Sequence, residues 1–178
     1  RFAVDEIRGL AGGSSIGGRG IKLAEGDALV SLGIVRHVDV TVAERYAYLK
    51  QVAALRRAES ADEDAEAADD EESASEETTL TPERFAALGA AEQFLLTVTD
   101  RGYGKRTSAY EYGLKGRATQ GVKGITRPDR VGQVLSVFTV EDGDELMMVS
   151  DKGQTIRLPV KDISFQGRAS NGVILFRT

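Results

Sequence analysis

Cysteine is absent from the 178 residues of the chain, and histidine occurs once. Without thiols the chain forms neither a disulfide nor a thiolate metal site, so a reducing compartment suits it. No apolar run approaches the roughly 20 residues that span a bilayer, and residues 1–8 lack the pattern of a signal peptide. We therefore expect a cytoplasmic protein without a membrane partner.

The residue patterns of common enzyme sites are missing from the sequence as well. His37 lies beside Arg36, and no cysteine or serine nucleophile is arranged with it, so we expect a surface role. The acidic stretch at residues 141–145 is typical of a turn and lacks the ligand spacing of a calcium loop. The sequence has no Gly-Lys-Ser/Thr phosphate loop, and no Gly-x-Gly-x-x-Gly precedes a predicted helix. It therefore predicts no catalytic residue, no metal site and no cofactor in this segment.

Charge is distributed unevenly along the chain. The formal net charge is −5, yet eleven acidic residues and no basic residue lie between residues 59 and 77. The remainder has 23 basic against 17 acidic residues. Residues 58–79 contain no aromatic or branched aliphatic residue, so they cannot bury enough surface to become ordered. We expect a mildly basic body that carries a mobile acidic linker.

A repeat organises the rest of the sequence. The stretch Gly116-Arg-Ala-Thr-Gln-Gly-Val-Lys-Gly-Ile125 returns, altered, as Gly167-Arg-Ala-Ser-Asn-Gly-Val-Ile-Leu-Phe176. Residues 94–125 align with residues 145–176 at a constant offset of 51 without a gap, and a weaker copy lies at residues 12–21. We call residues 12–21 loop 1, residues 116–125 loop 2 and residues 167–176 loop 3. Self-similarity at this period predicts a solenoid, a propeller or another array.

The residue types within the repeat favour β-structure. Short runs rich in β-forming residues, bounded by glycine or aspartate, predict strands at residues 28–35, 94–99, 135–140, 145–150 and 155–160. A four-stranded sheet of this size cannot bury both faces alone, so its repeats are expected to pack radially, as propeller blades do. The predicted fold class is all-β, with about three propeller-like blades and a small α-helical insertion.

Glycine recurs in the loops while its neighbours vary. Such recurrence is expected where φ is positive or where two chains approach closely, as in a bulge or a tight corner. We therefore predict that the loop glycines serve the backbone rather than a ligand: Gly12, Gly17, Gly116, Gly121, Gly167 and Gly172.

The strand pattern is interrupted by residues 36–93. The stretch Thr41-Val-Ala-Glu44 has the form of a capping box, and apolar residues at near-helical spacing continue to Arg57. The dipeptide Thr81-Pro82 predicts the start of a second, shorter helix. One strand should end near residue 35 and the next begin near residue 94, so we predict an insertion at a hairpin tip, where sheets tolerate added chain. The expected division is propeller at 1–35, insertion at 36–93 and propeller again at 94–178.

Three motifs in this order resemble a known family. The motifs are Gly102-Tyr-Gly-Lys-Arg-Thr107, loop 2 and loop 3. Together they resemble the C-terminal domain of the DNA gyrase A subunit, while the topoisomerase IV A subunit has a similar domain with more degenerate repeats. The resemblance covers residues 1–35 and 94–178. The chain lacks an initiating methionine, begins inside one repeat and stops two residues after another, so we expect a segment of a longer polypeptide.

The resemblance implies a six-bladed β-pinwheel whose basic rim wraps duplex DNA and supports ATP-dependent negative supercoiling by a type IIA topoisomerase. It also implies association with the gyrase B subunit in an A2B2 heterotetramer at the nucleoid, with the ATP and Mg²⁺ sites and the DNA-cleaving tyrosine elsewhere in the enzyme. The family's signature box, Gln-Arg-Arg-Gly-Gly-Lys-Gly, is not found in this sequence, and about half of the expected blades are present. The inserted helices have no counterpart in the family's common pattern.

Basic residues recur with the repeat, and repetition around a disc would place them on one rim. A row of guanidinium and ammonium groups at blade spacing suits phosphates, which position DNA without reading its sequence. One alternative is a solvated surface with intramolecular ion pairs, and another is a propeller-type scaffold that recruits a protein through its insertion. The predicted DNA-binding residues are Arg19, Arg101, Lys105, Arg106, Lys115, Arg117, Lys123, Lys152, Arg157 and Arg168.

The acidic segment at residues 59–77 yields the first testable prediction, that it competes with DNA for the basic rim. Tethering places it near the rim at an effective concentration of about millimolar, so screened attraction matters at low salt. Replacing residues 58–79 by a neutral Gly/Ser linker of equal length should tighten DNA binding at low ionic strength, with a difference that shrinks as salt rises. Equal affinity of the two proteins in a low-salt gel shift would contradict competition and would support a solvated spacer instead.

Overall fold

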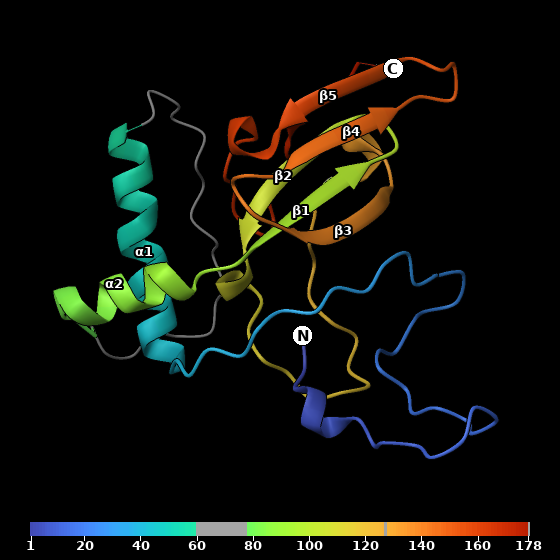
Figure 1. Cartoon of the computed structure of the whole chain (residues 1–178), viewed down its shortest axis with the longest axis horizontal. Helices are drawn as coiled ribbons and strands as arrows, with labels where there is room; N and C mark the ends of the chain where they lie inside the picture. The colour runs from blue at the N-terminus through green and yellow to red at the C-terminus, as the bar shows by residue number, and fades with distance from the viewer. Residues whose placement is uncertain (60–77, 127, 178) are drawn as a thin grey trace.

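The computed structural model describes residues 1–59, 78–126 and 128–177, so the predicted acidic linker lies almost wholly outside the described residues. Two antiparallel sheets form the centre of the molecule (Figure 1), one of four strands in the order β3-β1-β2-β6 and one of two strands, β4-β5. No described helix is long and apolar enough to cross a membrane. The strands are β1 (Phe94–Thr99), β2 (Tyr103–Ser108), β3 (Val134–Val140), β4 (Glu145–Val149), β5 (Thr155–Pro159) and β6 (Val173–Ile174).

The two sheets share one hydrophobic core. Leu96 and Val98 of β1 are buried together with Val140, Leu146, Val160 and Ile163, so the β4–β5 hairpin covers one face of the larger sheet. Four of the predicted strands are confirmed to within one residue at each end, and the largely antiparallel β-architecture with a few helices agrees with the predicted fold class. Short helical turns lie between the strands at η2 (Ala109–Glu111), α3 (Pro128–Val131) and η3 (Val160–Asp162), and a further turn, η1 (Val4–Glu6), lies in the N-terminal segment.

The strand predicted at residues 28–35 is not formed. Leu32 and Ile34 are 76% and 75% exposed, and no ladder pairs this segment with a neighbour in the described chain. A side-chain contact links it to the sheet: Ser31 Oγ accepts the backbone N–H of Val137 on the outer strand β3 at 2.9 Å. β-propensity alone does not make a strand, because a strand needs a partner that satisfies its N–H and C=O groups.

The predicted helices are confirmed. α1 (Val42–Glu59) begins with a reciprocal capping box, in which Thr41 N donates to Glu44 Oε2 at 2.9 Å and Glu44 N donates to Thr41 Oγ1 at 3.2 Å. α2 (Pro82–Ala91) is capped by Thr81, whose side chain accepts Arg84 N. Hydrogen bonds from Arg84, followed by the one from the Thr41 backbone, lower the pKa of Glu44 to about 2, so this carboxylate links the two helices in its ionised form.

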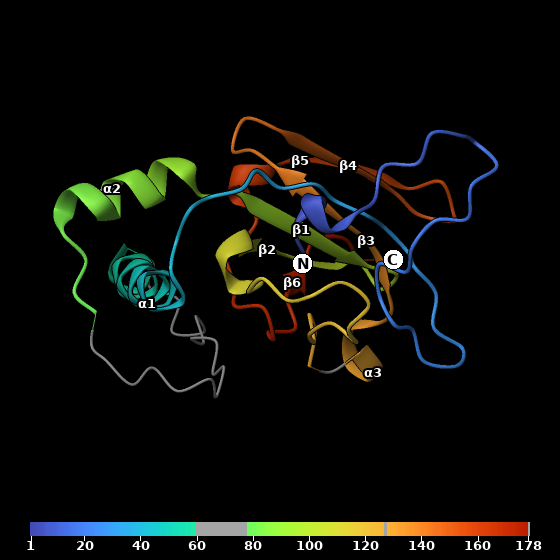
Figure 2. The same ribbon diagram turned by 90° about the horizontal axis from the view of Figure 1, so that it is seen from below.

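The helices pack against the sheet region rather than extending from it. Tyr48 and Val52 of α1 and Leu88 of α2 are buried with Tyr110 of η2, and Tyr110 Oη donates to Leu88 O at 3.0 Å. Figures 1 and 2 show the pair at one end of the sheet, with α1 seen along its axis in Figure 2 while α2 lies across it. The two ends of the insertion also meet, because Arg36 N donates to Gln93 Oε1 at 2.7 Å and Gln93 Nε2 donates to Arg36 O at 3.1 Å.

Backbone geometry separates the recurrent loop glycines into two groups. Gly121 and its repeat partner Gly172 both have a φ of +80°, a region that side chains with a Cβ rarely adopt. Gly12, Gly17, Gly116 and Gly167 are not among the residues with positive φ. A backbone requirement for glycine is thus visible at the second glycine of loops 2 and 3.

This difference provides a matched pair of substitutions. Gly121→Val should lower the free energy of unfolding by about 1–3 kcal/mol, since valine would be forced into the left-handed region. Gly116→Val in the same loop should melt close to the parent, because φ is not positive there and nothing lies within 4 Å of the added Cβ. Thermal and denaturant unfolding of both variants would check this, and equal loss of stability in the two would contradict it.

Candidate nucleic-acid interface

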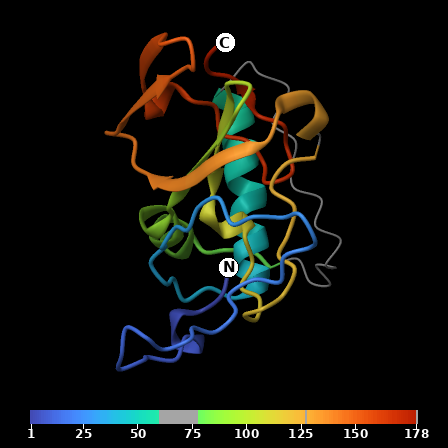
Figure 3. The same ribbon diagram turned by 90° about the vertical axis from the view of Figure 1, so that its right-hand side faces the viewer.

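Loops 1 and 2 lie side by side. Ala118 N donates to Gly20 O at 2.8 Å, and Lys22 N donates to Thr119 O at 2.9 Å, so the two backbones are joined directly. The Arg117 guanidinium adds a bond from Nη1 to Arg19 O at 3.1 Å. The N-terminal segment that contains loop 1 passes along the lower side of the molecule in Figures 1 and 3. Segments about a hundred residues apart in the sequence thereby form one continuous surface.

Loop 3 adjoins loop 2 on its other side. Arg168 Nη1 donates to Lys123 O at 2.5 Å, and Thr126 Oγ1 donates to Ala169 O. The ammonium group of Lys105 also bonds to carbonyl oxygens of both loops, at Gly124 and Gly167 among others. The three copies of the repeat loop are therefore neighbours in the order loop 1, loop 2, loop 3, which the sequence repeat alone could not show.

Seven of the ten predicted DNA-binding residues reach the surface. The turn between β1 and β2, which carries Arg101, and the turn between β4 and β5, which carries Lys152, lie on the same side of the molecule in Figure 1. Arg117 is half-buried because its guanidinium lies against loop 1. The exposed residues are Arg19, Arg101, Lys115, Lys123, Lys152 and Arg157.

The other three residues do not lie on the surface as the predicted basic rim requires. Lys105, Arg106 and Arg168 are 1%, 4% and 6% exposed. Burial lowers the pKa of Lys105 to about 8, against an opposing effect of the nearby Glu111 carboxylate, while the Arg168 guanidinium lowers it further. Their cationic groups donate to protein carbonyls instead of facing solvent. We therefore remove these three from the set of direct phosphate contacts.

Arg106 shows why the repeat misled the prediction. Its Nε donates to Ile163 O at 2.6 Å, its Nη1 pairs with Asp142 at 2.5 Å, and its guanidinium carbon lies 3.8 Å from the centre of the Phe165 ring. The repeat partner Arg157 is exposed and pairs with Glu145, Nε to Oε2 at 2.9 Å. Arg106 is on β2, between β1 and β6, whereas Arg157 is on a strand of the two-stranded sheet. A sequence repeat preserves the strand position and not the surroundings of the side chain.

The stretches that contain the three loops have basic residues and no acidic ones. This holds for residues 7–24, 112–126 and 163–177. Sequence reasoning based on matched repeat positions missed three exposed cations there, at Arg8, Lys22 and Arg177, although the missing carboxylates are a signal that the sequence contains. Two carboxylates from outside these stretches reach the loops, because Arg117 N donates to Glu6 Oε2 at 2.8 Å and Arg168 N donates to Glu111 Oε2. The cations still outnumber these carboxylates, so the surface attracts phosphate. The basic residues of these stretches are Arg8, Arg19, Lys22, Lys115, Arg117, Lys123, Arg168 and Arg177.

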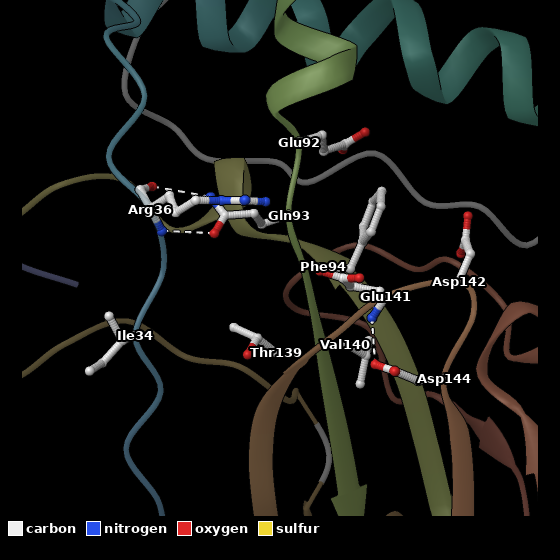
Figure 4. A pocket seen from close by; sticks show the side chains of 10 residues that line it. All are labelled: Ile34, Arg36, Glu92, Gln93, Phe94, Thr139, Val140, Glu141, Asp142 and Asp144. Carbon is white, nitrogen blue, oxygen red and sulfur yellow. Dashed lines mark hydrogen bonds between the residues drawn. The ribbon is translucent and has the colours of Figure 1, made fainter.

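A pocket of about 560 Å³ at the root of the insertion has the opposite charge (Figure 4). The β3–β4 turn lines one side, where Glu141 N donates to Asp144 Oδ2 at 2.8 Å. Arg36 is the one cation in the lining, and its backbone is bonded to the Gln93 side chain. Two of its four carboxylates, Glu92 and Asp142, are paired with Arg56 and Arg106. The other two, Glu141 and Asp144, still outnumber the guanidinium of Arg36, so this pocket is unsuited to phosphate. Its lining residues are Ile34, Arg36, Glu92, Gln93, Phe94, Thr139, Val140, Glu141, Asp142 and Asp144.

The contrast between Arg106 and Arg157 is directly testable. Arg106→Ala should lower the free energy of unfolding by about 2–4 kcal/mol, because it leaves the carbonyls of Ile163 and Lys161 without their donor and removes the stack on Phe165. Arg157→Ala should leave stability near that of the parent, since an exposed ion pair contributes little. Urea denaturation of both variants is the measurement, and similar losses at the two repeat positions would be inconsistent with their different burial.

Comparison with known proteins adds to this geometry. The DNA gyrase A subunit of Granulibacter bethesdensis is 47% identical over 179 residues, covering 97% of this chain and 19% of the relative. The DNA gyrase A subunit of Rickettsia bellii is 36% identical and covers 99% of this chain and 19% of the relative. The chain thus spans about a fifth of the length of these relatives. A solved structure of a DNA gyrase A C-terminal domain is 26% identical, covers 49% of this chain and 30% of its own, and has a TM-score of 0.46.

The family model for the DNA gyrase C-terminal domain, a β-propeller, matches residues 1–36, 93–141 and 144–178. These segments contain all three loops and the six strands, and they leave out the stretch with α1 and α2. The matched residues make up well over half of the sequence. The chain therefore belongs to the DNA gyrase C-terminal domain family.

Proposed function

We propose that this chain binds duplex DNA through its phosphates, without sequence specificity, and bends it as the wrapping part of a DNA gyrase A subunit. The observation that carries the proposal is the stack of loops 1, 2 and 3, whose surrounding stretches hold eight basic residues and no acidic residue. Phosphate contacts fix the position of a duplex and supply most of the non-specific affinity. The acidic pocket at the root of the insertion favours a path for DNA along the loops.

Bending follows from the arrangement of the loops. Consecutive repeats place equivalent loops next to one another, so cations recur along a line that crosses the repeats. A duplex that follows such a line around a propeller must curve, and the deformation is offset by the added phosphate contacts. In this proposal ATP-dependent negative supercoiling, Mg²⁺ binding and pairing with the gyrase B subunit belong to the complete enzyme, while the present segment contributes the DNA path.

Salt dependence tests the proposal. Duplexes of unrelated sequence should bind with similar affinity, and log K should fall steeply and linearly with log salt. The double variant Arg19→Ala/Lys123→Ala removes one exposed cation from loop 1 and one from loop 2, so its salt slope should be shallower by about two units. Fluorescence anisotropy across a salt series gives both quantities.

A matched control removes the same charge elsewhere. Lys50 and Arg57 are exposed on α1 and belong to none of the loops, so Lys50→Ala/Arg57→Ala changes the net charge equally without removing a proposed contact. This control should keep the parental slope. Equal slopes for the loop and helix variants would show that net charge alone attracts DNA, and a parent without steep salt dependence would eliminate the proposal.

A further inference from the structure

Lys105 lies at the centre of β2, opposite Thr97 of β1, and its side chain is one of the most completely buried in the described part of the chain. Its ammonium group has no carboxylate among its hydrogen-bond partners. It donates instead to a cluster of oxygens, of which all but one are backbone carbonyls. The partners of Nζ are Gly124 O at 2.7 Å, Gly167 O at 3.1 Å, Arg168 O at 2.5 Å, Ser170 O at 2.7 Å and Ser170 Oγ at 3.4 Å.

An ammonium group suits this position for a physical reason. Several carbonyl oxygens from two loops point at one spot, and they repel one another unless a cation or several donors lie between them. Lysine supplies three donors from one compact charge, whereas the planar guanidinium of arginine would direct its donors differently. Removing an ammonium group from water is costly, so its burial here requires the full set of carbonyl partners.

In loop 2 the bonded carbonyls belong to one exposed residue, Lys123, and to the residue that follows it. Lys105 holds the carbonyl of Gly124, the residue that follows Lys123. Arg168 holds the carbonyl of Lys123 itself, with Nη1 at 2.5 Å. Two successive peptide groups directly after the Lys123 Cα are thus bound by two buried cations, while the Lys123 side chain faces solvent.

We propose that Lys105, together with Arg168, is a positioning residue that holds the backbone of Lys123 so that the Lys123 ammonium group is presented to a DNA phosphate. The inference rests on the proposed DNA-binding function and adds a division of labour to it. Buried cations of β2 and loop 3 set the conformation of loop 2, and the exposed cation makes the contact. Holding the loop in advance lowers the entropy that is lost on binding and so favours the phosphate contact.

A double-mutant cycle on the intact chain tests this dependence. Lys123→Ala should make the salt slope of duplex binding shallower by about one unit, as expected for one lost phosphate contact. Lys105→Met, which keeps an unbranched side chain one atom shorter but removes its charge and donors, should have nearly the same effect. The double variant should lose about one unit in total, because Lys105 acts through Lys123. A loss of about two units would show that Lys105 contributes independently and would overturn the inference.

Backbone ¹⁵N relaxation without DNA gives a readout that a direct phosphate contact would not change. In Lys105→Met, the order parameters of Gly124 and Ile125 should fall from about 0.85 to below about 0.6, while those within α1 should not change. Unchanged order parameters in loop 2 would overturn the positioning role. If the parent bound DNA without steep salt dependence, the DNA-binding proposal would fail, whereas an additive cycle on a salt-dependent parent would remove the inference alone.

The unmodified protein provides the test if Lys105→Met does not fold. Burial lowers the pKa of Lys105 to about 8, with Glu111 and Arg168 as the charged groups that act on it, so raising the pH from about 7 to about 9 removes one ammonium donor. The DNA affinity of the parent should then fall more than the DNA affinity of Lys123→Ala. The other titrating groups affect both proteins equally, so the difference reports the action of Lys105 through Lys123. The same pH dependence in both proteins would overturn the inference.

Discussion

Lys105 and Arg106, two neighbouring cations of β2, are buried beneath segments that follow them in the sequence. Much of the structure depends on the hydrogen bonds and the ion pair that these two side chains make. Lys105 draws together the carbonyls of loops 2 and 3, and Arg106 binds the carbonyls of Ile163 and Lys161 and the Asp142 carboxylate. The two side chains point to opposite faces of the strand, as neighbours on a strand must. Lys105 therefore binds loops 2 and 3 together, and Arg106 binds the segment around η3 and the β3–β4 turn to β2.

The helical insertion is joined to the same system through aromatic rings. Phe165, which stacks with the Arg106 guanidinium at 3.8 Å, also stacks with Arg56 of α1 at 4.0 Å. Arg56 in turn pairs with Glu92 at the end of α2, whose carboxylate accepts the Tyr48 hydroxyl at 2.8 Å. Cation–π contacts gain strength where the ring and the cation are removed from water. The insertion is thus packed onto the sheets by buried contacts of its own and is more than a tethered appendage.

Local signals in the sequence predicted local structure well. The capping box at Thr41, the Thr81 cap and four strands depend on residues close to each other in the chain, and all are present. Two features were not predicted correctly because they depend on residues that are far apart in the sequence. The segment at 28–35 has strand composition without a pairing partner, and Arg106 differs from Arg157 only in what covers it. The repeat correctly indicated the family, while the identity of the solvent-facing cations required the three-dimensional arrangement of the loops.

The paired bonds between Arg36 and Gln93 have a consequence for the length of the insertion. They bring the two ends of a long inserted segment together where β1 begins, so β1 starts from the same point whatever the number of inserted residues. The free energy of closing a loop rises only slowly with its length, which makes the cost of a longer insertion small. Added residues between the two helices should therefore be tolerated, whereas loss of the helices would expose Tyr110 and Phe165 to water.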